Sequence, residues 1–594
     1  MTVPDRISAL RAAMRRARLD AFIVPSNDPH QSEYVAEHWK AREWISGFSG
    51  SAGTVVVTRD QAGLWTDSRY FLQAESEIAG SEIILFRQGE SGVPPYTDWL
   101  LEHFGPGNRI GIDGKIISGA GYGHLLEKLN RKALVLVTDQ DPIAESWSDR
   151  PPLPQQPVYA HPEPYAGSSR AEKLAQIRAA LVDLQADAHL VSTLDDIAWL
   201  TNLRGADVDF NPVFYAYVLV QRGAAMLFVD APMVSEAMRT ALKADHIEVL
   251  TPEALPQMLA TLDGGTLLID PENTAQALID LIPDGCQVVH GAAPSTLLKA
   301  QKNATELAHL RQTMAKDAQA LLRLYRWLEA ELPSGRVTEA RVAAQLQNFR
   351  AAQPNYRGES FPAIAGYGPN GAIVHYRPDP ENSATLRPEG IFLLDSGGQY
   401  LDGTTDITRT VALGPVSAQA RRDYTLVLKG HIALARARFP VGKSGYHLDT
   451  LARMHLWEHG QDYGHGTGHG VGFFLNVHEG PHGIRGAHRG AATTVLEPGM
   501  VISNEPGYYA SSQYGIRIEN LILVVPAPEH EGFLEFETLT LFPIDTALID
   551  RSLLRDDEVA WLNDYHIRVL DTLRKKVEPE EFAWLVEKCR PLPL

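Results

Sequence analysis

Cysteine is scarce in this chain of 594 residues, which contains only Cys286 and Cys589. Two cysteines so far apart exclude the disulfide framework of a small secreted protein, and they also exclude a Cys₄ zinc site. Long hydrophobic runs are missing as well, since no stretch approaches the about 18 uninterrupted apolar residues that span a membrane. The N-terminal residues read as a basic amphipathic helix and a strand, without the apolar core of a signal peptide. We therefore expect a soluble cytoplasmic protein that has no membrane partner.

The chain also lacks a surplus of positive charge. The chain has 54 Lys and Arg residues against 73 Asp and Glu residues, which gives a net charge of −19. Nucleic acid is therefore excluded as a partner, because binding of phosphate requires a basic surface. The hydrophobic content of 44% and the charged content of 21% are those of a globular protein. The length exceeds what one hydrophobic core supports and predicts roughly three to four domains.

An internal repeat is the clearest sign of domain organisation. Residues 10–13 match residues 177–180, and Asp20 matches Asp187 at the same offset. In both copies a helical pattern precedes a short apolar strand, and a segment that contains tryptophan and ends in glycine follows. Helix–strand units also resemble one another by chance. We nevertheless predict two related α/β domains in tandem, because the period is too long for a solenoid.

Two boundaries separate these domains from the rest of the chain. Residues 151–164 are rich in proline, which is typical of a semi-extended linker. Near residues 295–305 a long amphipathic helix is predicted to begin, with apolar residues at helical spacing from Leu307 to Ala318. We predict an α/β (α+β) protein. Its expected domains are residues 1–155, residues 156–303 and residues 304–594, with a mostly helical C-terminal extension from about residue 549.

Two aspartates flank a glycine-rich turn in the third domain. Asp395 ends the apolar run 391–394, and Asp406 opens the run ITRTVAL. The two runs are predicted to form antiparallel strands that bring both carboxylates to one point of a sheet. Two adjacent carboxylates repel, and the pKa of one would rise unless a cation lies between them. A single aspartate at a strand end is more often a turn cap. The pair indicates a metal site only in combination with the candidate ligands described below.

Histidine is concentrated in one short part of the chain. Seven of the 21 histidines lie in residues 455–488: His455, His459, His465, His469, His478, His482 and His488. His465 and His469 are four residues apart, as in a helical zinc motif. The glycines around them argue against a helix, because each would cost about 1 kcal/mol there. We expect a strand-like segment, with His482 and His488 as solvated bystanders.

Two glutamates complete the set. Glu505 follows the apolar run MVISN immediately before a Pro-Gly turn. Glu519 lies in the run GIRIENLILVV, predicted as one strand, with Arg517 on the same face. A carboxylate in so apolar a strand needs compensation, either from a metal or from Arg517. Four carboxylates and one imidazole form the ligand set of a hydrolytic two-metal site: Asp395, Asp406, His469, Glu505 and Glu519.

These segments resemble a known family. The stretches DSGGQYLDGTTDITRT, GHGTGHGVGFFLNVHEGP, ISNEPGYY and GIRIEN are similar to those of the metal-dependent Xaa-Pro aminopeptidases (aminopeptidase P). These enzymes belong to the pita-bread metallopeptidases, family M24. The resemblance covers the whole chain and is greatest to the three-domain form. It implies two creatinase-like N-terminal domains and a C-terminal pita-bread catalytic domain.

The resemblance also implies roles for individual residues. Asp395 would hold one metal ion, His469 and Glu505 would hold the other, and Asp406 and Glu519 would bridge the two. His375 and His478 would contact the substrate, with Glu505 as the proton shuttle. His465 and Arg517 would support the site, and Arg69 of the first domain would reach towards bound peptide, although a surface role for Arg69 stays open. Tyr508, Tyr509 and Phe473 are candidates for an apolar slot around the proline ring.

The resemblance further implies two divalent metal ions, with Mn²⁺ as the expected metal and Co²⁺ or Zn²⁺ as alternatives. Through a hydroxide shared by both metals, the enzyme would cut the first peptide bond of peptides that carry proline at the second position. Three alternatives stay open: a prolidase that cleaves X-Pro dipeptides, a non-catalytic peptide-binding relative, and a creatinase-like hydrolase without metal. The C-terminal extension and apolar surface predict a homodimer.

Overall fold

The computed structural model describes residues 1–488 and 490–593. The chain divides into two compact units. Unit 1 contains Met1–Glu163 and Ser168–Thr296, and unit 2 contains Pro164–Gly167 and Leu297–Leu594. The units are described separately below.

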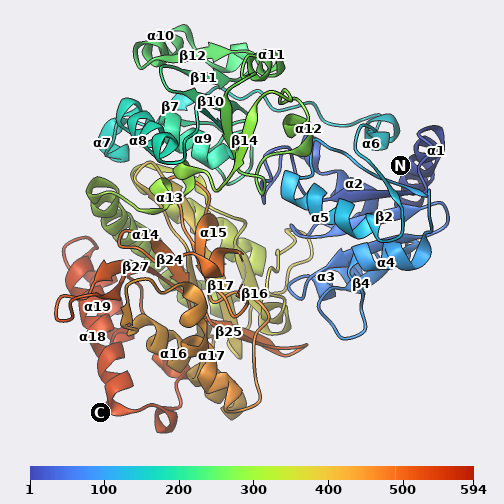
Figure 1. Ribbon diagram of the computed structural model, residues 1–594. Helices are drawn as coiled ribbons and strands as arrows, with labels where there is room; N and C mark the ends of the chain where they lie inside the picture. The colour runs from blue at the N-terminus through green and yellow to red at the C-terminus, as the bar shows by residue number, and fades with distance from the viewer. Residues whose placement is uncertain (489, 594) are drawn as a thin grey trace. The chain divides into compact units, whose positions relative to one another are not determined.

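The first half of unit 1 is a mixed sheet covered by helices (Figure 1). Helix α1 (Val3–Arg16) begins at Thr2, whose side chain forms a capping box with Asp5, and it buries Ile7, Leu10 and Met14. The sheet has the order β4-β3-β2-β1-β5-β6. Its strands are β1 (Ala21–Pro25), β2 (Thr54–Thr58), β3 (Ala62–Thr66), β4 (Ile83–Arg87), β5 (Arg109–Ile112) and β6 (Val135–Val137). The helices that follow α1 are α2 (Ala41–Ser46), α3 (Phe71–Glu77), α4 (Tyr96–His103), α5 (Gly119–Asn130) and α6 (Pro142–Ser146).

The second half of unit 1 repeats this topology. Its sheet has the order β12-β11-β10-β8-β13-β14. In each half the first strand pairs antiparallel with one neighbour and parallel with the other. The strands are β8 (Ala188–Val191), β10 (Tyr217–Gln221), β11 (Ala225–Phe228), β12 (Ile247–Leu250), β13 (Thr266–Ile269) and β14 (Gln287–His290). The helices are α8 (Arg170–Asp183), α9 (Leu194–Thr201), α10 (Glu236–Ala244), α11 (Leu255–Ala260) and α12 (Gln276–Ile279). The predicted tandem α/β architecture is therefore confirmed.

Between the two halves, residues 151–158 are all described and form no helix or strand, as the proline content predicts. Short elements follow them, namely β7 (Tyr159–Ala160) and α7 (Glu163–Ala166), and β9 (Leu203–Arg204) pairs with β7. The two halves of unit 1 are joined by buried polar contacts. The Tyr215 hydroxyl donates to Asp28 at 2.8 Å, and a ring nitrogen of His30 lies 2.6 Å from the Ser192 carbonyl oxygen.

Unit 2 opens with the long amphipathic helix predicted from the sequence, α14 (Ala304–Glu331), which Asn303 caps. Leu310, Met314 and Ala318 are buried on its inner face. The other helices are α13 (Pro294–Ala300, which begins in unit 1), α15 (Glu339–Ala351), α16 (Ala418–Ala435), α17 (Asp449–Trp457), α18 (Asp556–Leu573) and α19 (Pro579–Lys588). The C-terminal extension is thus mostly helical, as expected, and α14, α16 and α19 all contact α18.

These helices surround several antiparallel sheets (Figure 1). A six-stranded sheet, β21-β28-β27-β24-β22-β23, contains β21 (Phe439–Pro440), β22 (Gly468–Gly470), β23 (Glu479–Ile484), β24 (Val501–Asn504), β27 (Asn520–Pro526) and β28 (Phe533–Thr538). A second sheet contains β16 (Ile364–Tyr367), β17 (Ile391–Ser396) and β20 (Ile407–Ala412). Two smaller sheets contain β15 (Tyr356–Glu359), β18 (Gly398–Tyr400) and β19 (Gly403–Thr404), and β25 (Gly507–Ala510) and β26 (Tyr514–Arg517). This α+β arrangement agrees with the fold class that the sequence predicts for the catalytic domain.

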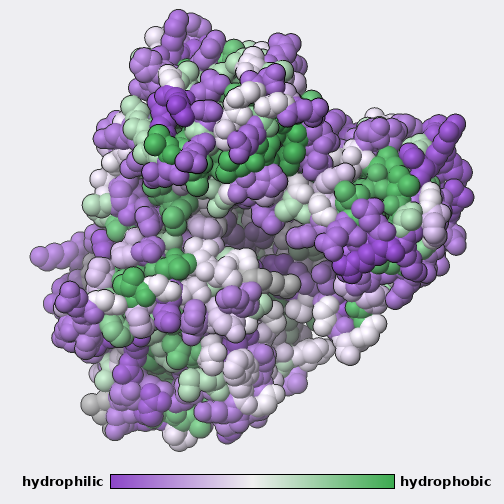
Figure 2. Space-filling model, viewed as in Figure 1, coloured by the Kyte–Doolittle hydropathy of each residue, from purple (hydrophilic) through white to green (hydrophobic). Residues whose placement is uncertain are grey.

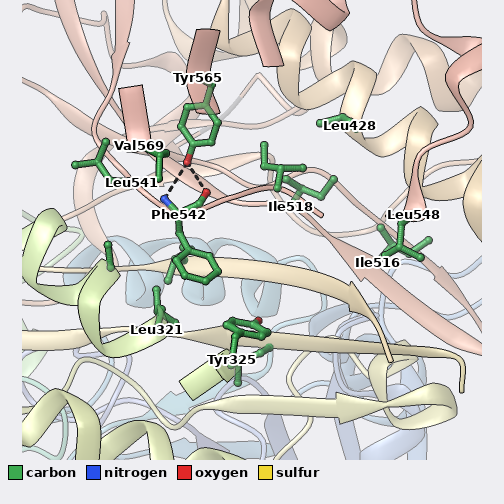
Figure 3. Close-up of a cluster of buried hydrophobic side chains, with 14 of the residues drawn as sticks. Leu321, Tyr325, Leu428, Ile516, Ile518, Leu541, Phe542, Leu548, Tyr565 and Val569 are labelled. Atoms are coloured by element: carbon green, nitrogen blue, oxygen red, sulfur yellow. Dashed lines mark hydrogen bonds between the residues drawn. The ribbon is translucent and has the colours of Figure 1, made fainter. Parts of the chain in front are cut away.

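The main core of unit 2 lies between these sheets and the C-terminal helices. Figure 3 shows part of it, where Tyr325 of α14 and Tyr565 of α18 lie on opposite sides of Phe542. On the surface, the visible face of each unit is mostly hydrophilic or neutral, with hydrophobic residues in small groups (Figure 2). Among the described helices, none has the length and hydrophobicity that crossing a membrane requires.

Candidate active site

The first two carboxylates come from neighbouring strands. Strand β17 pairs antiparallel with β20, and Asp395 lies directly opposite Thr408. Asp406 immediately precedes β20, so its carboxylate lies beside that of Asp395 at one end of this strand pair. The prediction that the two runs form adjacent antiparallel strands is confirmed. Both residues are buried, with exposures of 8% for Asp395 and 4% for Asp406.

His469 and Glu505 come from the six-stranded sheet. His469 lies in β22, which pairs with β24, and Glu505 directly follows β24. The segment is a strand rather than a helix, as its glycines predict. A Cβ on Gly468 would lie 2.0 Å from the Ser503 carbonyl oxygen, and one on Gly470 would lie 2.2 Å from the Glu479 carbonyl oxygen. Glycine on both sides of His469 therefore allows the neighbouring backbones to approach closely.

Glu519 lies between two strands, and this corrects the expectation of one continuous strand. Strand β26 ends at Arg517 and β27 begins at Asn520. Between them the Ile518 amide bonds to Pro506 and the Glu519 amide donates to the Thr408 carbonyl, so the chain passes from one sheet to another. The Thr408 hydroxyl donates to the Glu519 carboxylate at 2.7 Å. The break turns a fully buried carboxylate towards Asp406.

Arg517 compensates the carboxylate of Asp395, and not that of Glu519, which its position two residues away in the sequence suggested. Its guanidinium contacts Asp395 at 2.6 Å, across 122 residues of sequence. A metal-free Arg517–Glu519 ion pair, the simpler interpretation of this strand, is therefore wrong. Arg517, His465 and His469 lie at ion-pair distance from carboxylates of this cluster. Of these three side chains, only the Arg517 guanidinium is permanently charged.

The ligand atoms converge on one point. One atom from each of Asp406, His469 and Glu519 lies within 4.8 Å of the others. The Nε2 atom of His469 lies 3.5 Å from a carboxylate oxygen of Asp406 and 3.5 Å from one of Glu505. The Nδ1 atom of His469 contacts the Gly470 carbonyl oxygen at 2.9 Å. Because this contact makes Nδ1 the donor, Nε2 is the ring atom that is left to bind a metal ion.

The electrostatics of the cluster call for a cation. Burial, reinforced by Asp406 and Glu505 and opposed by Arg517, raises the pKa of Asp395 to about 6. Burial and the neighbouring carboxylates raise the pKa of Glu519 well above its usual value. Burial lowers the pKa of His469, but Asp406 and Glu505 outweigh it and raise the pKa to about 9. Crowded carboxylates of this kind favour a bound cation.

One further observation tests whether the residues fit a metal. The Oδ1 atom of Asp395 is buried and has no hydrogen-bond partner among the described residues. A buried carboxylate oxygen without a partner is costly unless a cation fills that position. Oxygen donors with one imidazole suit Mn²⁺ and other divalent ions of intermediate hardness. The residues therefore fit divalent metal ions.

Tyr509 of β25 connects the supporting residues. Its hydroxyl accepts from Arg517 at 2.6 Å and lies 2.7 Å from Nε2 of His465, whose Nδ1 is 2.7 Å from the Gly466 carbonyl. Nδ1 of His465 is also 4.0 Å from Glu505. The structure thus brings His465 and Arg517 together beside the carboxylates. The hydroxyl of Tyr509 is occupied by these bonds, so only its ring can line an apolar slot.

The remaining predicted residues fall into two groups. His478 lies beside the cluster, with its ring centroid 4.3 Å from that of His469. His375 is half-buried and follows Val374, whose carbonyl accepts from Arg517 at 3.5 Å. Arg69 belongs to unit 1, where it forms a bidentate pair with Asp67. For His482 the expectation of a solvated side chain is wrong, because it is 1% exposed and bonds to the Val501 carbonyl at 3.0 Å.

Sequence reasoning missed a buried ion triad behind β22. Lys299 and Lys302 contact the two carboxylate oxygens of Glu479 at 3.2 Å and 2.5 Å, and all three side chains are at most 2% exposed. Glu479 follows His478 directly and lies opposite Gly470 in the sheet. The only signal in the sequence is a glutamate beside two glycine-rich segments, which does not identify partners 177 residues away.

Family models match nearly the whole chain. The Creatinase/Prolidase N-terminal domain matches residues 6–145 and, in a second model, residues 149–306. Metallopeptidase family M24 matches residues 308–526, and its C-terminal region matches residues 532–592.

Known proteins match over the same extent. A probable Xaa-Pro aminopeptidase P of Laccaria bicolor is 42% identical over 99% of this chain and 93% of its own length. Aminopeptidase P2 of Arabidopsis thaliana is 42% identical over 100% of this chain and 89% of its own. The crystal structure of an X-prolyl aminopeptidase from Caenorhabditis elegans, described as a cytosolic enzyme with a di-nuclear active site, superposes with a TM-score of 0.95 at 36% identity and covers both chains fully. An Xaa-Pro dipeptidase from Bacillus anthracis, with a TM-score of 0.51 at 22% identity over 64% of this chain and 99% of its own, shares the fold alone.

Proposed function

Because the chain belongs to the Xaa-Pro aminopeptidase P family of M24 metallopeptidases, we propose that it removes the N-terminal residue from peptides that carry proline at the second position. One observation carries the proposal: ligand atoms of Asp406, His469 and Glu519 converge within 4.8 Å, Glu505 lies 3.5 Å from His469, and Asp395 is held beside them by Arg517. The relatives named for this activity match the chain over its full length, which supports the same conclusion.

The proposed cofactor is a pair of divalent metal ions, most simply Mn²⁺, with Co²⁺ or Zn²⁺ as alternatives. Asp395 would hold one ion, His469 and Glu505 the other, and Asp406 and Glu519 both. When bound, the ions supply a hydroxide nucleophile at neutral pH and polarise the scissile carbonyl group. The di-nuclear site of the Caenorhabditis elegans relative and the orphaned Asp395 Oδ1 support two ions.

The protein's own groups would orient the substrate and move the proton. We assign to Glu505, which is half-buried, the transfer of a proton to the leaving nitrogen of proline. His478 and His375 would orient the scissile carbonyl and the backbone on the proline side. Through Tyr509, His465 and Arg517 would keep Asp395 and Glu505 in place. Arg69 is proposed to contact longer peptides.

The leaving group explains the specificity for proline. The X-Pro bond is a tertiary amide without an N–H group. A site built for this bond needs no acceptor at that nitrogen, whereas an ordinary peptide would bury an unsatisfied donor there. A buried donor without a partner costs about 1–3 kcal/mol, which corresponds to roughly 5- to 150-fold discrimination.

Hydrolysis of three peptides tests the proposal. With added Mn²⁺ we expect release of alanine from Ala-Pro-Ala, and at least about 5-fold slower release from Ala-Ala-Ala. Faster cleavage of Ala-Pro than of Ala-Pro-Ala would identify a prolidase instead. No hydrolysis of any of them with any divalent metal would support a non-catalytic peptide-binding protein.

We further propose a homodimer and a cytoplasmic location. Large apolar side chains are exposed on unit 2, among them Val441 (55%) and Trp457 (47%), and the Caenorhabditis elegans relative is described as cytosolic. The proposed domains are residues 1–155, 156–303 and 304–594, with a C-terminal extension from about residue 549. Sedimentation equilibrium at micromolar concentration tests the dimer, and a stable monomer would contradict it.

A further inference from the structure

Arg409 is a buried cation directly behind the ligand cluster. It lies on β20 and is 1% exposed. Its guanidinium donates to the Glu519 carbonyl oxygen at 2.6 Å and to the Thr408 carbonyl oxygen at 2.9 Å. Thr408 also donates its hydroxyl to the Glu519 carboxylate. Arg409 therefore joins the strand that follows Asp406 to the segment that carries Glu519.

The C-terminal helix α18 completes the surroundings of Arg409. The Tyr565 hydroxyl accepts from the guanidinium at 3.0 Å and from the Phe542 amide at 3.2 Å, and it donates to the Phe542 carbonyl at 2.8 Å. Figure 3 shows the hydroxyl pointing between these two backbone atoms of Phe542. The same guanidinium donates to the Phe542 and Pro543 carbonyls. Tyr565 is itself only 4% exposed. Its hydroxyl thus holds one side of the Arg409 guanidinium, which is shielded from water.

The network continues to the third ligand segment. Arg409 donates to the side-chain oxygen of Asn520, the residue after Glu519, at 2.8 Å. The amide of Asn520 lies 3.2 Å from Nε2 of His431, and Nδ1 of His431 lies 3.1 Å from the Asn504 carbonyl, just before Glu505. Burial lowers the pKa of His431 to about 3, and Arg409 reinforces the shift, so the ring is neutral. Nδ1 therefore donates to the Asn504 carbonyl, and Nε2 accepts from the side-chain amide of Asn520. Trp561, one turn before Tyr565, packs edge-on against His431.

We propose that Tyr565 is a positioning residue of the metal centre, through which α18 holds Glu519, Asn520 and the strand after Asp406 by way of Arg409. The inference rests on the proposed function, because it concerns the two residues that would bridge the metal ions. Groups that orient metal ligands from behind are typically worth about 10- to 100-fold in metal affinity or activity. The C-terminal extension therefore contributes to the geometry of the site as well as to the core.

The test compares two tyrosine-to-phenylalanine variants from the same core. Tyr565→Phe removes the hydroxyl that accepts from Arg409. Tyr325→Phe removes a hydroxyl on the other face of Phe542, 5.3 Å away between ring centroids, that is buried without a hydrogen-bond partner among the described residues. Both changes remove one oxygen from the same cluster, so only a loss specific to Tyr565→Phe reports the link to Arg409.

Two measurements are made on the full chain. Calorimetric titration of the metal-free proteins with Mn²⁺ should give roughly 10-fold weaker binding for Tyr565→Phe and an unchanged affinity for Tyr325→Phe. With Ala-Pro-Ala at saturating Mn²⁺, kcat should fall about 10-fold for Tyr565→Phe while KM stays within about 2-fold, because the substrate-contacting residues are not altered.

The outcomes separate this inference from the proposed function. Wild-type protein that binds Mn²⁺ but does not cleave Ala-Pro-Ala would contradict the proposed function, while the titration still decides the inference. Equal Mn²⁺ affinity and kcat for wild type and Tyr565→Phe would overturn the inference. Equal losses in both variants would also overturn it, since they would show a general effect of packing. If Tyr565→Phe is unstable, hydrogen exchange of residues 519–525 at low temperature must still be faster than in Tyr325→Phe for the inference to stand.

Discussion

Neutralising Glu479 should destabilise the strand pair that carries His469. The Glu479 carboxylate is fully buried between the ammonium groups of Lys299 and Lys302. Glu479→Gln keeps the shape of the side chain but leaves two positive charges buried without a counter-charge. Breaking a buried ion pair in this way costs about 3–5 kcal/mol. The strands concerned are β22 and β23, because Glu479 begins β23 and lies opposite Gly470.

Hydrogen exchange measures this loss locally. In Glu479→Gln, the amides that bond β22 to β23, such as that of Thr467 to Ile484, should exchange more than about 100-fold faster, since every 1.36 kcal/mol is tenfold. Glu587→Gln is the matched control, because it breaks an exposed ion pair with Arg590 and should cost less than about 1 kcal/mol. Exchange in Glu479→Gln within about 5-fold of this control would refute the reasoning.

The remaining predictions concern ligands, packing and pH. Asp406→Ala should reduce hydrolysis of Ala-Pro-Ala to below a few per cent while circular dichroism stays unchanged; substantial residual activity would count against a bridging role. Gly470→Ala should lower the free energy of unfolding by roughly 1–3 kcal/mol, because its Cβ would lie 2.2 Å from the Glu479 carbonyl oxygen, and denaturant titration checks this. Burial lowers the pKa of His482 to about 4, so the folded protein holds it neutral. Its stability contribution is complete above the unfolded pKa of about 6.5 and is lost towards pH 4, by about 1.4 kcal/mol per pH unit. His482→Gln should flatten the stability curve in this range, and an unchanged slope would refute the assignment.

Local patterns in the sequence predicted much of the fold because each pattern is set by nearby residues. Thr2 and Asp5 cap the first helix, and Asn303 caps the long helix of unit 2, within a few residues of the positions expected from apolar periodicity. The repeated helix–strand units became two sheets with the same strand order. The ends of β17 and β24, where Asp395 and Glu505 lie, follow directly from apolar runs bounded by turns.

The parts of the site that the sequence did not predict depend on contacts between distant segments. Arg517 lies two residues from Glu519, which suggested that they pair, yet its guanidinium contacts Asp395 because the strand breaks at Ile518. The break follows from a hydrogen bond of Glu519 to Thr408, 111 residues earlier, which no local pattern reveals. The burial of Glu479 with Lys302 depends likewise on how two distant loops meet.

A metal titration of activity tests the central claim most directly. Protein stripped of metal is titrated with Mn²⁺, and the initial rate of alanine release from Ala-Pro-Ala is measured at each addition. The proposed set of five ligands, of which Asp406, His469 and Glu519 converge within 4.8 Å, predicts no activity without metal and a plateau at two ions per chain. Full activity in the stripped protein, or a plateau at one ion per chain, would contradict the assignment of a two-metal aminopeptidase.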